Sequence, residues 1–302
     1  MRIKPQYKLA DLYFKLAYKI GILVKPRDLQ SRVTSYPYMC WDTYFNLSDF
    51  QITNKNDLIE LQSILQIQSI HTVYLLTSLL DEFIETVKNS KYEIKKLVIG
   101  ETDDHNSVSK LIPLLQYIDQ IYANHLVGDH PKISAFPVGI ERQSYRSSGK
   151  LKNFKKVAST NPKKRNIPIL VAWNDSTNTN RANYKKEFEL SNKTLIIQQR
   201  VSASTLHNMM RKTLFVPCPA GNGIDTHRVW ESIYLGAVPV ILKSEFCGNE
   251  KWPVLLVDSW RYLINKNLFE LQKIYENFAL SQKESLAFGT AILADVFGKD
   301  NV

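Results

Sequence analysis

The stretch that decides the fold runs from Cys218 to Leu242 and reads CPAGNGIDTHRVWESIYLGAVPVIL. It begins at the end of an apolar run, passes through a loop of small residues, and enters a segment with helical spacing that Gly236 ends. A second apolar run, Val238 to Leu242, follows directly. A strand, a tight loop, a helix and a second strand in this order predict part of a parallel α/β sheet.

The loop within this stretch has the composition of an anion-binding loop. Gly221 and Gly223 allow the backbone to approach a ligand closely, and Asp225 or Thr226 can cap the helix that follows. The free N–H groups and the positive dipole end of a helix N-terminus suit a phosphate group. Because ligands of open α/β sheets bind at this end of the strands, we expect a ligand site here.

Arg228 and Glu231 lie three residues apart and therefore share one face of the predicted helix. A cation for a diphosphate and a carboxylate for a ribose diol would equip that face to bind a nucleotide. An i,i+3 ion pair on a solvated face explains the same two residues. The spacing alone favours neither interpretation.

The rest of the chain repeats the alternation of apolar runs and helical stretches. The predicted strands are 71–77, 97–100, 120–123, 132–137, 167–173, 195–198, 213–218, 238–242 and 254–257. Continuous apolar strands of this kind predict parallel sheets covered on both faces. We expect two α/β domains, residues 1–150 and 167–302, and the last helix can cross back to the first domain.

Residues 151–166 are the predicted linker between these domains. The wider segment 146–166 holds eight cations and no acid, with Pro, Asn, Ser and Gly between them, which is typical of an exposed connection. The cations are Arg146, Lys150, Lys152, Lys155, Lys156, Lys163, Lys164 and Arg165.

Length and composition agree with two globular domains. The chain has 302 residues, about twice the usual domain length, and its 44% hydrophobic and 23% charged residues exclude a disordered or fibrous protein. The net charge is +10. Segment 1–27 carries +6 and segment 146–166 carries +8, so the remainder carries −4. The positive charge is therefore confined to two segments rather than spread over the fold.

The first 27 residues have the pattern of a basic amphipathic helix. Apolar side chains recur at helical spacing and lysines occupy the other faces. Its apolar positions are Leu9, Leu12, Tyr13, Leu16, Ile20 and Leu23. Such a stripe usually packs on the body of the protein, and the alternative is peripheral contact with an anionic membrane.

The cysteines and the hydropathy indicate a cytoplasmic protein. Cys40, Cys218 and Cys247 are far apart and form no Cys-x-x-Cys pair, which favours a reducing compartment. No run of 18 apolar residues and no signal peptide is evident. We expect a cytoplasmic location, with the cytoplasmic membrane face as the place of any peripheral binding.

The run Gly-Asn-Gly-Ile-Asp-Thr-His-Arg-x-Trp-Glu-x-x-x-x-Gly-x-x-Pro-Val at 221–240 resembles the donor-binding signature of exostosin-like glycosyltransferases of the family 47 type. Bacterial homologues and ribitol xylosyltransferase-type sequences are the most similar. Shorter matches occur in order from about residue 36 to 262. They are Trp41-Asp42-Thr43, with Trp41 in place of a glycine, Gly100-Glu101-Thr102-Asp103, Pro137-Val138-Gly139-Ile140-Glu141, Thr177-Asn178 with Arg181 at a spacing one residue short, and Trp252-Pro253-Val254 with Val257-Asp258-Ser259-Trp260.

This resemblance implies a GT-B architecture, in which two Rossmann-like domains face each other across a cleft. The C-terminal domain would bind a nucleotide-sugar and the N-terminal domain a glycan or lipid-linked glycan acceptor. The residues that would bind the donor are Asn222, Gly223, Asp225, His227 and Arg228 near the diphosphate, Glu231 at ribose or sugar hydroxyls, and Asn178 and Arg181 from the facing loop. The product would be a hexosyl- or pentosyl-bearing polysaccharide.

An inverting reaction also needs a general base for the acceptor hydroxyl. Asp103 is the first candidate, with Asp42 and Asp104 behind it, and helix capping explains Asp103 and Asp104 equally well. The chain has no Asp-x-Asp sequence, which argues against metal-dependent transfer. We therefore expect no metal and no cofactor, the nucleotide-sugar being a substrate.

Two other functions remain open at this stage. The cations of 146–166 suggest a basic nucleic-acid-binding α/β protein, although no recognised nucleic-acid motif is present and we expect no nucleic acid as partner. A different nucleotide-sugar enzyme, such as an epimerase, is the other alternative. It would need a nicotinamide site, and no Gly-x-Gly-x-x-Gly follows the first strand.

Overall fold

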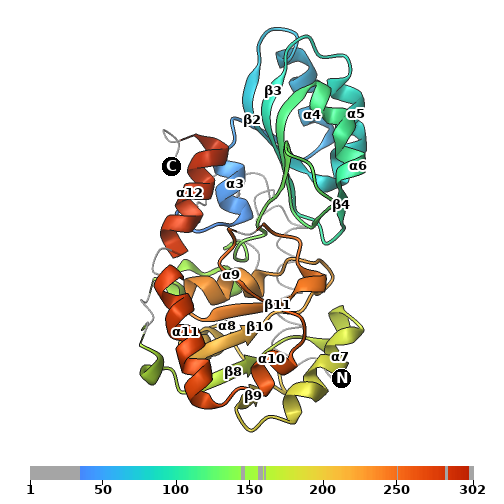
Figure 1. Ribbon diagram of the computed structural model, residues 1–302. Coiled ribbons are helices and arrows are strands. Elements are labelled where there is room, and N and C mark those ends of the chain that lie inside the picture. Colours follow the sequence, from blue (N-terminus) through green and yellow to red (C-terminus); the bar gives the residue numbers. More distant parts are fainter. Residues whose placement is uncertain are drawn as a thin grey trace, which may run out of the picture.

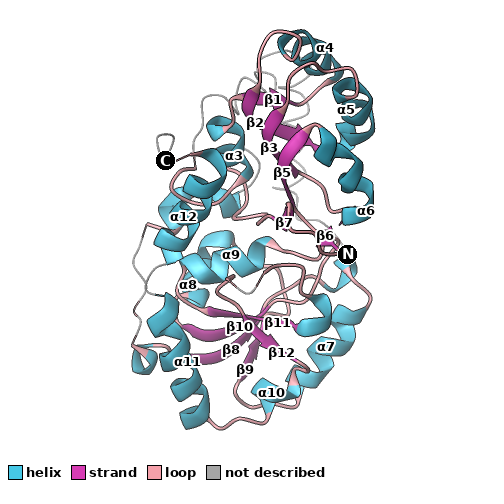
Figure 2. Cartoon of the chain, turned by 45° about the horizontal axis from the view of Figure 1, so that its top comes forward, coloured by secondary structure: helices cyan, strands magenta, loops and turns pink. Residues whose placement is uncertain are grey.

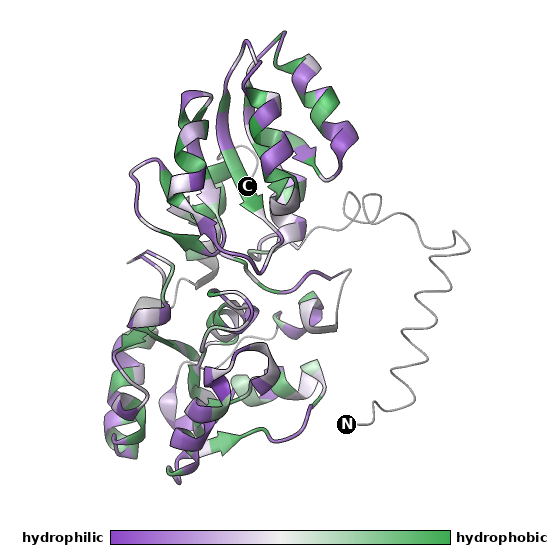
Figure 3. Ribbon diagram, turned by 90° about the vertical axis from the view of Figure 1, so that its right-hand side faces the viewer, coloured by the Kyte–Doolittle hydropathy of each residue, from purple (hydrophilic) through white to green (hydrophobic). Residues whose placement is uncertain are grey.

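The computed structural model describes residues 35–143, 147–155, 159, 161–249, 251–282 and 285–298. The predicted helix in segment 1–27 lies outside this range. Two five-stranded parallel sheets dominate the described chain, one on each side of the 146–166 segment (Figure 1). Strands rich in apolar residues lie between helices whose outer faces are hydrophilic (Figure 3).

The N-terminal sheet has the strand order β1-β2-β3-β5-β7. Its strands are β1 (Phe50–Ile52), β2 (Ile70–Leu76), β3 (Ile94–Gly100), β5 (Ile118–Ala123) and β7 (Ile133–Ala135). The order in space follows the order in the chain, so right-handed crossovers all pass over the same face. The crossing elements pack there on one apolar cluster. They are α4 (Lys55–Ile64), α5 (Leu80–Val87), α6 (Val108–Leu111) and the 3-10 turn η2 (Ile112–Gln116).

The opposite face of this sheet is covered by two helices from far apart in the chain, α3 (Trp41–Leu47) and α12 (Ser285–Phe297) (Figure 2). The ring of Tyr44 in α3 lies 4.6 Å from that of Phe136 and 6.2 Å from that of Phe297 in α12. Lys96 of β3 also donates to the backbone carbonyl oxygen of Asp295. The last helix therefore crosses back and completes the core of the first sheet.

The C-terminal sheet has the strand order β12-β11-β10-β8-β9. Its strands are β8 (Ile167–Val171), β9 (Thr194–Ile196), β10 (Thr213–Pro217), β11 (Val238–Leu242) and β12 (Leu255–Val257). The helices of this half are α7 (Asn180–Glu189), α8 (Ala203–Met210), α9 (His227–Tyr234), α10 (Arg261–Ile264) and α11 (Leu268–Gln282). Two Rossmann-like parallel sheets confirm the predicted α/β fold class.

The two sheets differ in one respect that bears on ligand binding. From β8 the chain goes to β9 on one side and to β10 on the other, so the strand order reverses between β8 and β10. Such a reversal opens a crevice at the carboxyl ends of the two strands. The N-terminal sheet has no reversal in its described strands, so the topology favours a ligand site on the C-terminal half.

A continuous apolar core joins the two halves. Tyr38 and Met39 from the N-terminal half belong to the same buried cluster as Trp230 and Tyr234 of α9. The backbone N–H of Met39 donates to the hydroxyl of Tyr234 at 2.9 Å. The interface between the halves is therefore packed like a domain interior over this region.

The segment between the sheets differs from the exposed connection expected from its composition. Arg165 is 2% exposed, and its guanidinium donates to the carbonyl oxygens of Ser159, Met210, Thr213 and Leu235. Phe154 is also buried. The prediction of a fully exposed segment is wrong at these two residues, because carbonyl acceptors and apolar neighbours compensate for their burial.

Within the described ranges, no helix combines the length and the hydropathy that crossing a bilayer requires.

Candidate functional site

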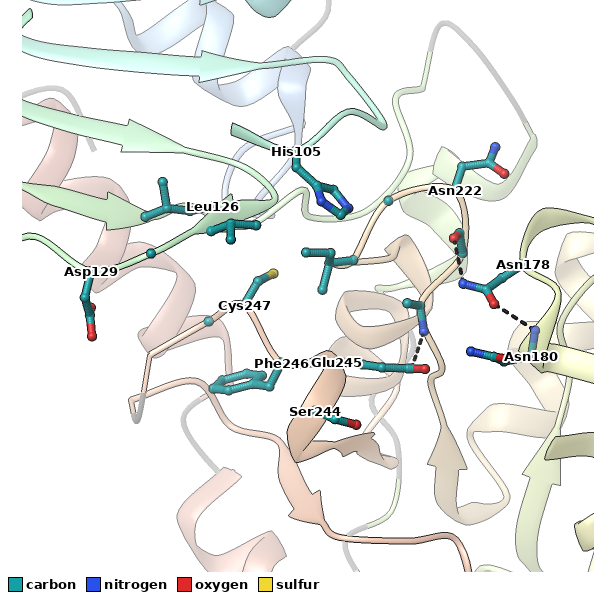
Figure 4. Close-up of a pocket in the computed structure, with 17 residues that line it drawn as sticks. His105, Leu126, Asp129, Asn178, Asn180, Asn222, Ser244, Glu245, Phe246 and Cys247 are labelled. Carbon is teal, nitrogen blue, oxygen red and sulfur yellow. Dashed lines mark hydrogen bonds between the residues drawn. The ribbon is translucent and has the colours of Figure 1, made fainter. Parts of the chain in front are cut away.

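The loops after β8, β10 and β11 meet at the switch point and form a cavity of about 700 Å³. Leu126 to Asp129 and His105 close it from the N-terminal half (Figure 4). Leu126 and Val127 form the short strand β6, which pairs with β4 (Asn106–Ser107). The cavity therefore lies between the two halves, at the end of the C-terminal sheet where a ligand is expected.

Arg181 at the start of α7 holds the glycine-rich loop in place. Its guanidinium donates to the carbonyl oxygens of Pro219 at 2.8 Å and Ala220 at 2.9 Å. It also donates to the Thr177 hydroxyl at 2.7 Å and to the carbonyl oxygen of Asn174 at 3.2 Å. Arg181 is 8% exposed. It acts on the loop backbone, a role that differs from the direct phosphate contact expected from the sequence.

Asn178, Asn222 and Gly223, which the resemblance names as donor-binding residues, line the cavity. The amide of Asn178 donates to the carbonyl oxygen of Gly221 at 3.4 Å. The amide of Asn222 donates to Oδ2 of Asp103 at 3.1 Å, which joins the glycine-rich loop to the N-terminal half.

Asp225 is buried beneath the loop, outside the cavity wall. Its Oδ2 accepts from the backbone N–H of Val138 at 2.9 Å and from Nε1 of Trp230 at 2.8 Å. Burial raises the pKa of Asp225 to about 6. Of the two predicted caps, Thr226 occupies the N-cap position of α9, but its side chain makes no capping hydrogen bond.

His227 opens α9 and faces the segment 137–141. Its Nδ1 lies 2.8 Å from the carbonyl oxygen of Gly139, so Nδ1 carries the proton and donates. Its Nε2 lies 3.7 Å from Oε2 of Glu141. The hydrogen bonds from His227 to Gly139 and from Val138 to Asp225 therefore join segment 137–141 to the signature at 221–240.

Arg228 and Glu231 form the ion pair that their spacing allows. Nη1 of Arg228 donates to Oε2 of Glu231 at 2.7 Å, and Nε2 of His207 lies 3.4 Å from Oε1. Burial alone would raise the pKa of Glu231, but Arg228 and His207 outweigh it and the pKa is lowered. The Glu231 side chain is only 6% exposed, whereas that of Arg228 is 24% exposed. Of the two, Arg228 is the one that solvent reaches.

The three candidate bases occupy different environments. Asp103 is exposed beside the cavity and bonded to Asn222, and Asp104 is exposed with its backbone N–H bonded to the Thr102 hydroxyl. The helix-capping interpretation of both is wrong, since Ser107 caps α6. Asp42 is 0% exposed inside α3 and accepts from the backbone N–H of Gln143 at 3.1 Å. The structure does not bring Asp42 to the cavity.

Glu101 and His125 have strained backbone conformations that the sequence does not predict. Glu101 has φ = 63° and His125 has φ = 47°, which is the left-handed region that non-glycine residues seldom adopt. Glu101 is paired with Arg142 at 2.7 Å. The His125 ring lies over Gly223, where a Cβ would come within 2.4 Å of it. The ring fits in this position because residue 223 is a glycine and has no side chain.

Glu245 was also missed. It follows β11 and lines the cavity, and its carboxylate accepts from the backbone N–H of Ala220 at 2.8 Å and from the hydroxyl of Tyr184 at 2.9 Å. The only sequence signal for it is its position at the carboxyl end of a predicted strand.

Among the residues that the structure describes, no three His, Cys, Asp or Glu side chains are grouped as ligands of a metal ion.

No family model matches the sequence, and a search of curated proteins finds no match. Among solved structures, the chain is similar to an alpha,alpha-trehalose-phosphate synthase (UDP-forming) from Burkholderia vietnamiensis. The TM-score is 0.39 at 10% sequence identity, and the match covers 84% of this chain and 78% of that one.

Proposed function

We propose that this protein is a glycosyltransferase, which moves a hexosyl or pentosyl group from a nucleotide-sugar to a glycan or lipid-linked glycan. The observation that carries the proposal is the cavity at the switch point of the C-terminal sheet, bounded by both halves of the molecule. A donor bound by one half and an acceptor presented by the other would meet there. Residues 221–224, the start of the sequence signature at 221–240, line this cavity.

The chemistry is substitution at the anomeric carbon of the donor sugar, with a nucleoside diphosphate leaving. Negative charge develops on the leaving phosphate in the transition state, so fixed donors and cations aimed at it would lower the barrier. Arg228 and His227 stand in the first turn of α9, where the helix dipole adds positive potential. Arg228 and the N-terminus of α9 would supply this stabilisation without a metal ion.

Asp103 is the proposed general base. It comes from the N-terminal half, after β3, and its carboxylate is held by Asn222 of the donor loop. A base in this place would stand between the acceptor and the donor, where the acceptor hydroxyl loses its proton. Asp104 lies beside it, but its contacts are with Thr102 and not with the donor loop.

The proposed setting is the cytoplasmic face of a membrane that carries the acceptor. Lys150, Lys152, Lys155, Lys163 and Lys164 are exposed in the segment between the sheets and support contact with an anionic surface. Removal of residues 1–27 should weaken binding to vesicles containing phosphatidylglycerol. Equal binding by the shortened and full chains would contradict a membrane role for that segment.

The function is tested by a thermal-shift panel of nucleoside diphosphates and nucleotide-sugars, followed by a transfer and hydrolysis assay with the stabilising donor. Arg228→Ala should lose activity while remaining folded, and Glu231→Gln should lose most of it. Wild-type protein that no nucleotide stabilises, but that binds random DNA with a steep salt dependence, would instead support the nucleic-acid alternative.

A further inference from the structure

The charged groups on the cavity wall are mainly acidic. Asp129 and Glu245 contribute carboxylates and His105 an imidazole. The other described lining groups are amides, a hydroxyl, a thiol, apolar side chains and backbone. Asp129 is exposed, but the partly buried carboxylate of Glu245 repels a phosphate group placed against it. The interior of the cavity therefore suits an uncharged ligand.

Glu245 is the most firmly fixed of these groups. Its Oε2 accepts from the backbone N–H of Ala220 at 2.8 Å, and its Oε1 accepts from the Tyr184 hydroxyl at 2.9 Å. Burial, with the help of Glu245, raises the pKa of Tyr184 to about 12, so this hydroxyl keeps its proton and donates. A carboxylate has about four lone-pair positions, so each oxygen retains one for a further donor.

An aromatic ring stands next to this carboxylate. Phe246 lines the cavity beside Glu245 (Figure 4), and its ring is fixed edge-on against Trp252 at 5.8 Å and 86°. Leu126 contributes apolar surface from the other half of the molecule. A sugar ring has hydroxyl groups on its edge and apolar C–H groups on its faces. Oriented acceptors next to apolar walls match that combination.

We infer that Glu245 accepts hydrogen bonds from neighbouring hydroxyl groups of an uncharged sugar ring in this cavity. The diphosphate lies outside it, towards Arg228 and the N-terminus of α9. The inference rests on the proposed function, and the ring belongs either to the donor sugar or to the acceptor.

The test compares wild type, Glu245→Gln, Tyr184→Phe and the control Glu189→Gln. Glu189 is an exposed carboxylate at the far end of α7, the helix that carries Tyr184. Calorimetry measures affinity for UDP, GDP and their glucose, galactose and xylose derivatives. Thermal shift with free glucose, galactose and xylose is measured with and without the nucleoside diphosphate.

If the ring is the donor's, Glu245→Gln weakens the nucleotide-sugar about tenfold and leaves the nucleoside diphosphate unchanged, because one charge-assisted contact is lost. If the ring belongs to the acceptor, Glu245→Gln binds the nucleoside diphosphate and the nucleotide-sugar as wild type does. The free sugar then no longer stabilises the variant. Tyr184→Phe retains the charge and should weaken the same ligand about threefold, through positioning alone. If Glu245→Gln does not fold, Tyr184→Phe replaces it in the test.

Two results would overturn the inference. One is unchanged binding of every ligand by Glu245→Gln, and the other is an equal loss for nucleoside diphosphate and nucleotide-sugar. Failure of the proposed function is distinguishable, since wild type would then bind no nucleotide. In that case the free-sugar titration decides alone, and wild-type protein that no free sugar stabilises would also overturn the inference.

Discussion

The backbone N–H of Asp225 donates to Nδ1 of His125 at 3.1 Å, across the boundary between the two halves of the molecule. Because Nδ1 accepts, the ring carries its proton on Nε2 and is neutral. Burial lowers the pKa of His125 to about 4 and raises that of Asp225 to about 6. This contact therefore places two oppositely perturbed groups beside the loop of the candidate site.

The two groups should cancel in the pH dependence of stability. His125 binds fewer protons folded than unfolded, so its contribution is full above pH 6.5 and is lost as the pH falls towards 4. Asp225 binds more protons folded than unfolded, so its contribution is full below about 3.8 and is lost as the pH rises through 6. Each term amounts to about 3 kcal/mol, and their slopes oppose each other between pH 4 and 6.

Single variants should expose each slope in urea unfolding from pH 4 to 7. His125→Asn, which retains an acceptor and tolerates the left-handed backbone, should be less stable at pH 6 than at pH 4. Asp225→Asn should be more stable at pH 6 than at pH 4. A flat profile in both variants would contradict the two shifts.

Gly223→Ala should destabilise the protein by about 2 kcal/mol, because the new Cβ would meet the His125 ring. Gly221→Ala is the milder comparison, since its Cβ would meet only the end of Arg181 at 3.0 Å. Adding His125→Asn to Gly223→Ala should recover part of the loss. Chemical unfolding of the single and double variants measures the coupling, and additive losses would rule out the predicted clash.

Gly100→Ala should cost about 3 kcal/mol, because its Cβ would lie 2.0 Å from the ring of Trp41. Gly100 has no side chain, and the ring of Trp41 packs against its backbone. When Trp41→Gly is already present, adding Gly100→Ala should no longer lower the stability. Thermal unfolding measures this, and a persistent loss would point to another cause.

Arg181→Lys should weaken nucleotide binding at least about tenfold, because lysine cannot span the carbonyl oxygens of Pro219 and Ala220 with one planar fork. The fold should persist. Arg261→Lys, in the exposed first position of α10, is the control and should bind as wild type. Calorimetry measures both, and wild-type affinity in Arg181→Lys would show that the loop needs no such clamp.

Asp103→Asn should reduce turnover by about a hundredfold or more while changing donor affinity little, because a general base contributes to the chemical step. Asp81→Asn, on the exposed surface of α5, is the matched control. Steady-state kinetics separates kcat from KM. A change confined to donor affinity would assign Asp103 to the binding of the donor instead.

The sequence by itself determined the α/β class, nine of the ten strands of the two sheets and the position of the glycine-rich loop, whereas the short edge strand β1 was not predicted. Apolar strand runs and helical periodicity are local patterns, and they persist whatever the strands pack against. The resemblance groups Asn178, Asn222 and Gly223 as donor-binding residues, and all three line the cavity.

Only the tertiary structure decided what the charged side chains do. The sequence places Arg165 in an exposed linker and the resemblance places Arg181 at the donor, yet both are buried and donate to carbonyl oxygens of distant segments. Asp42 lies in α3 and is fully buried. The carboxylate of Glu245 is held by hydrogen bonds from the Tyr184 hydroxyl and the backbone N–H of Ala220. The partners of these side chains lie far away in the sequence, and a hydrogen bond forms only where folding brings donor and acceptor to about 3 Å.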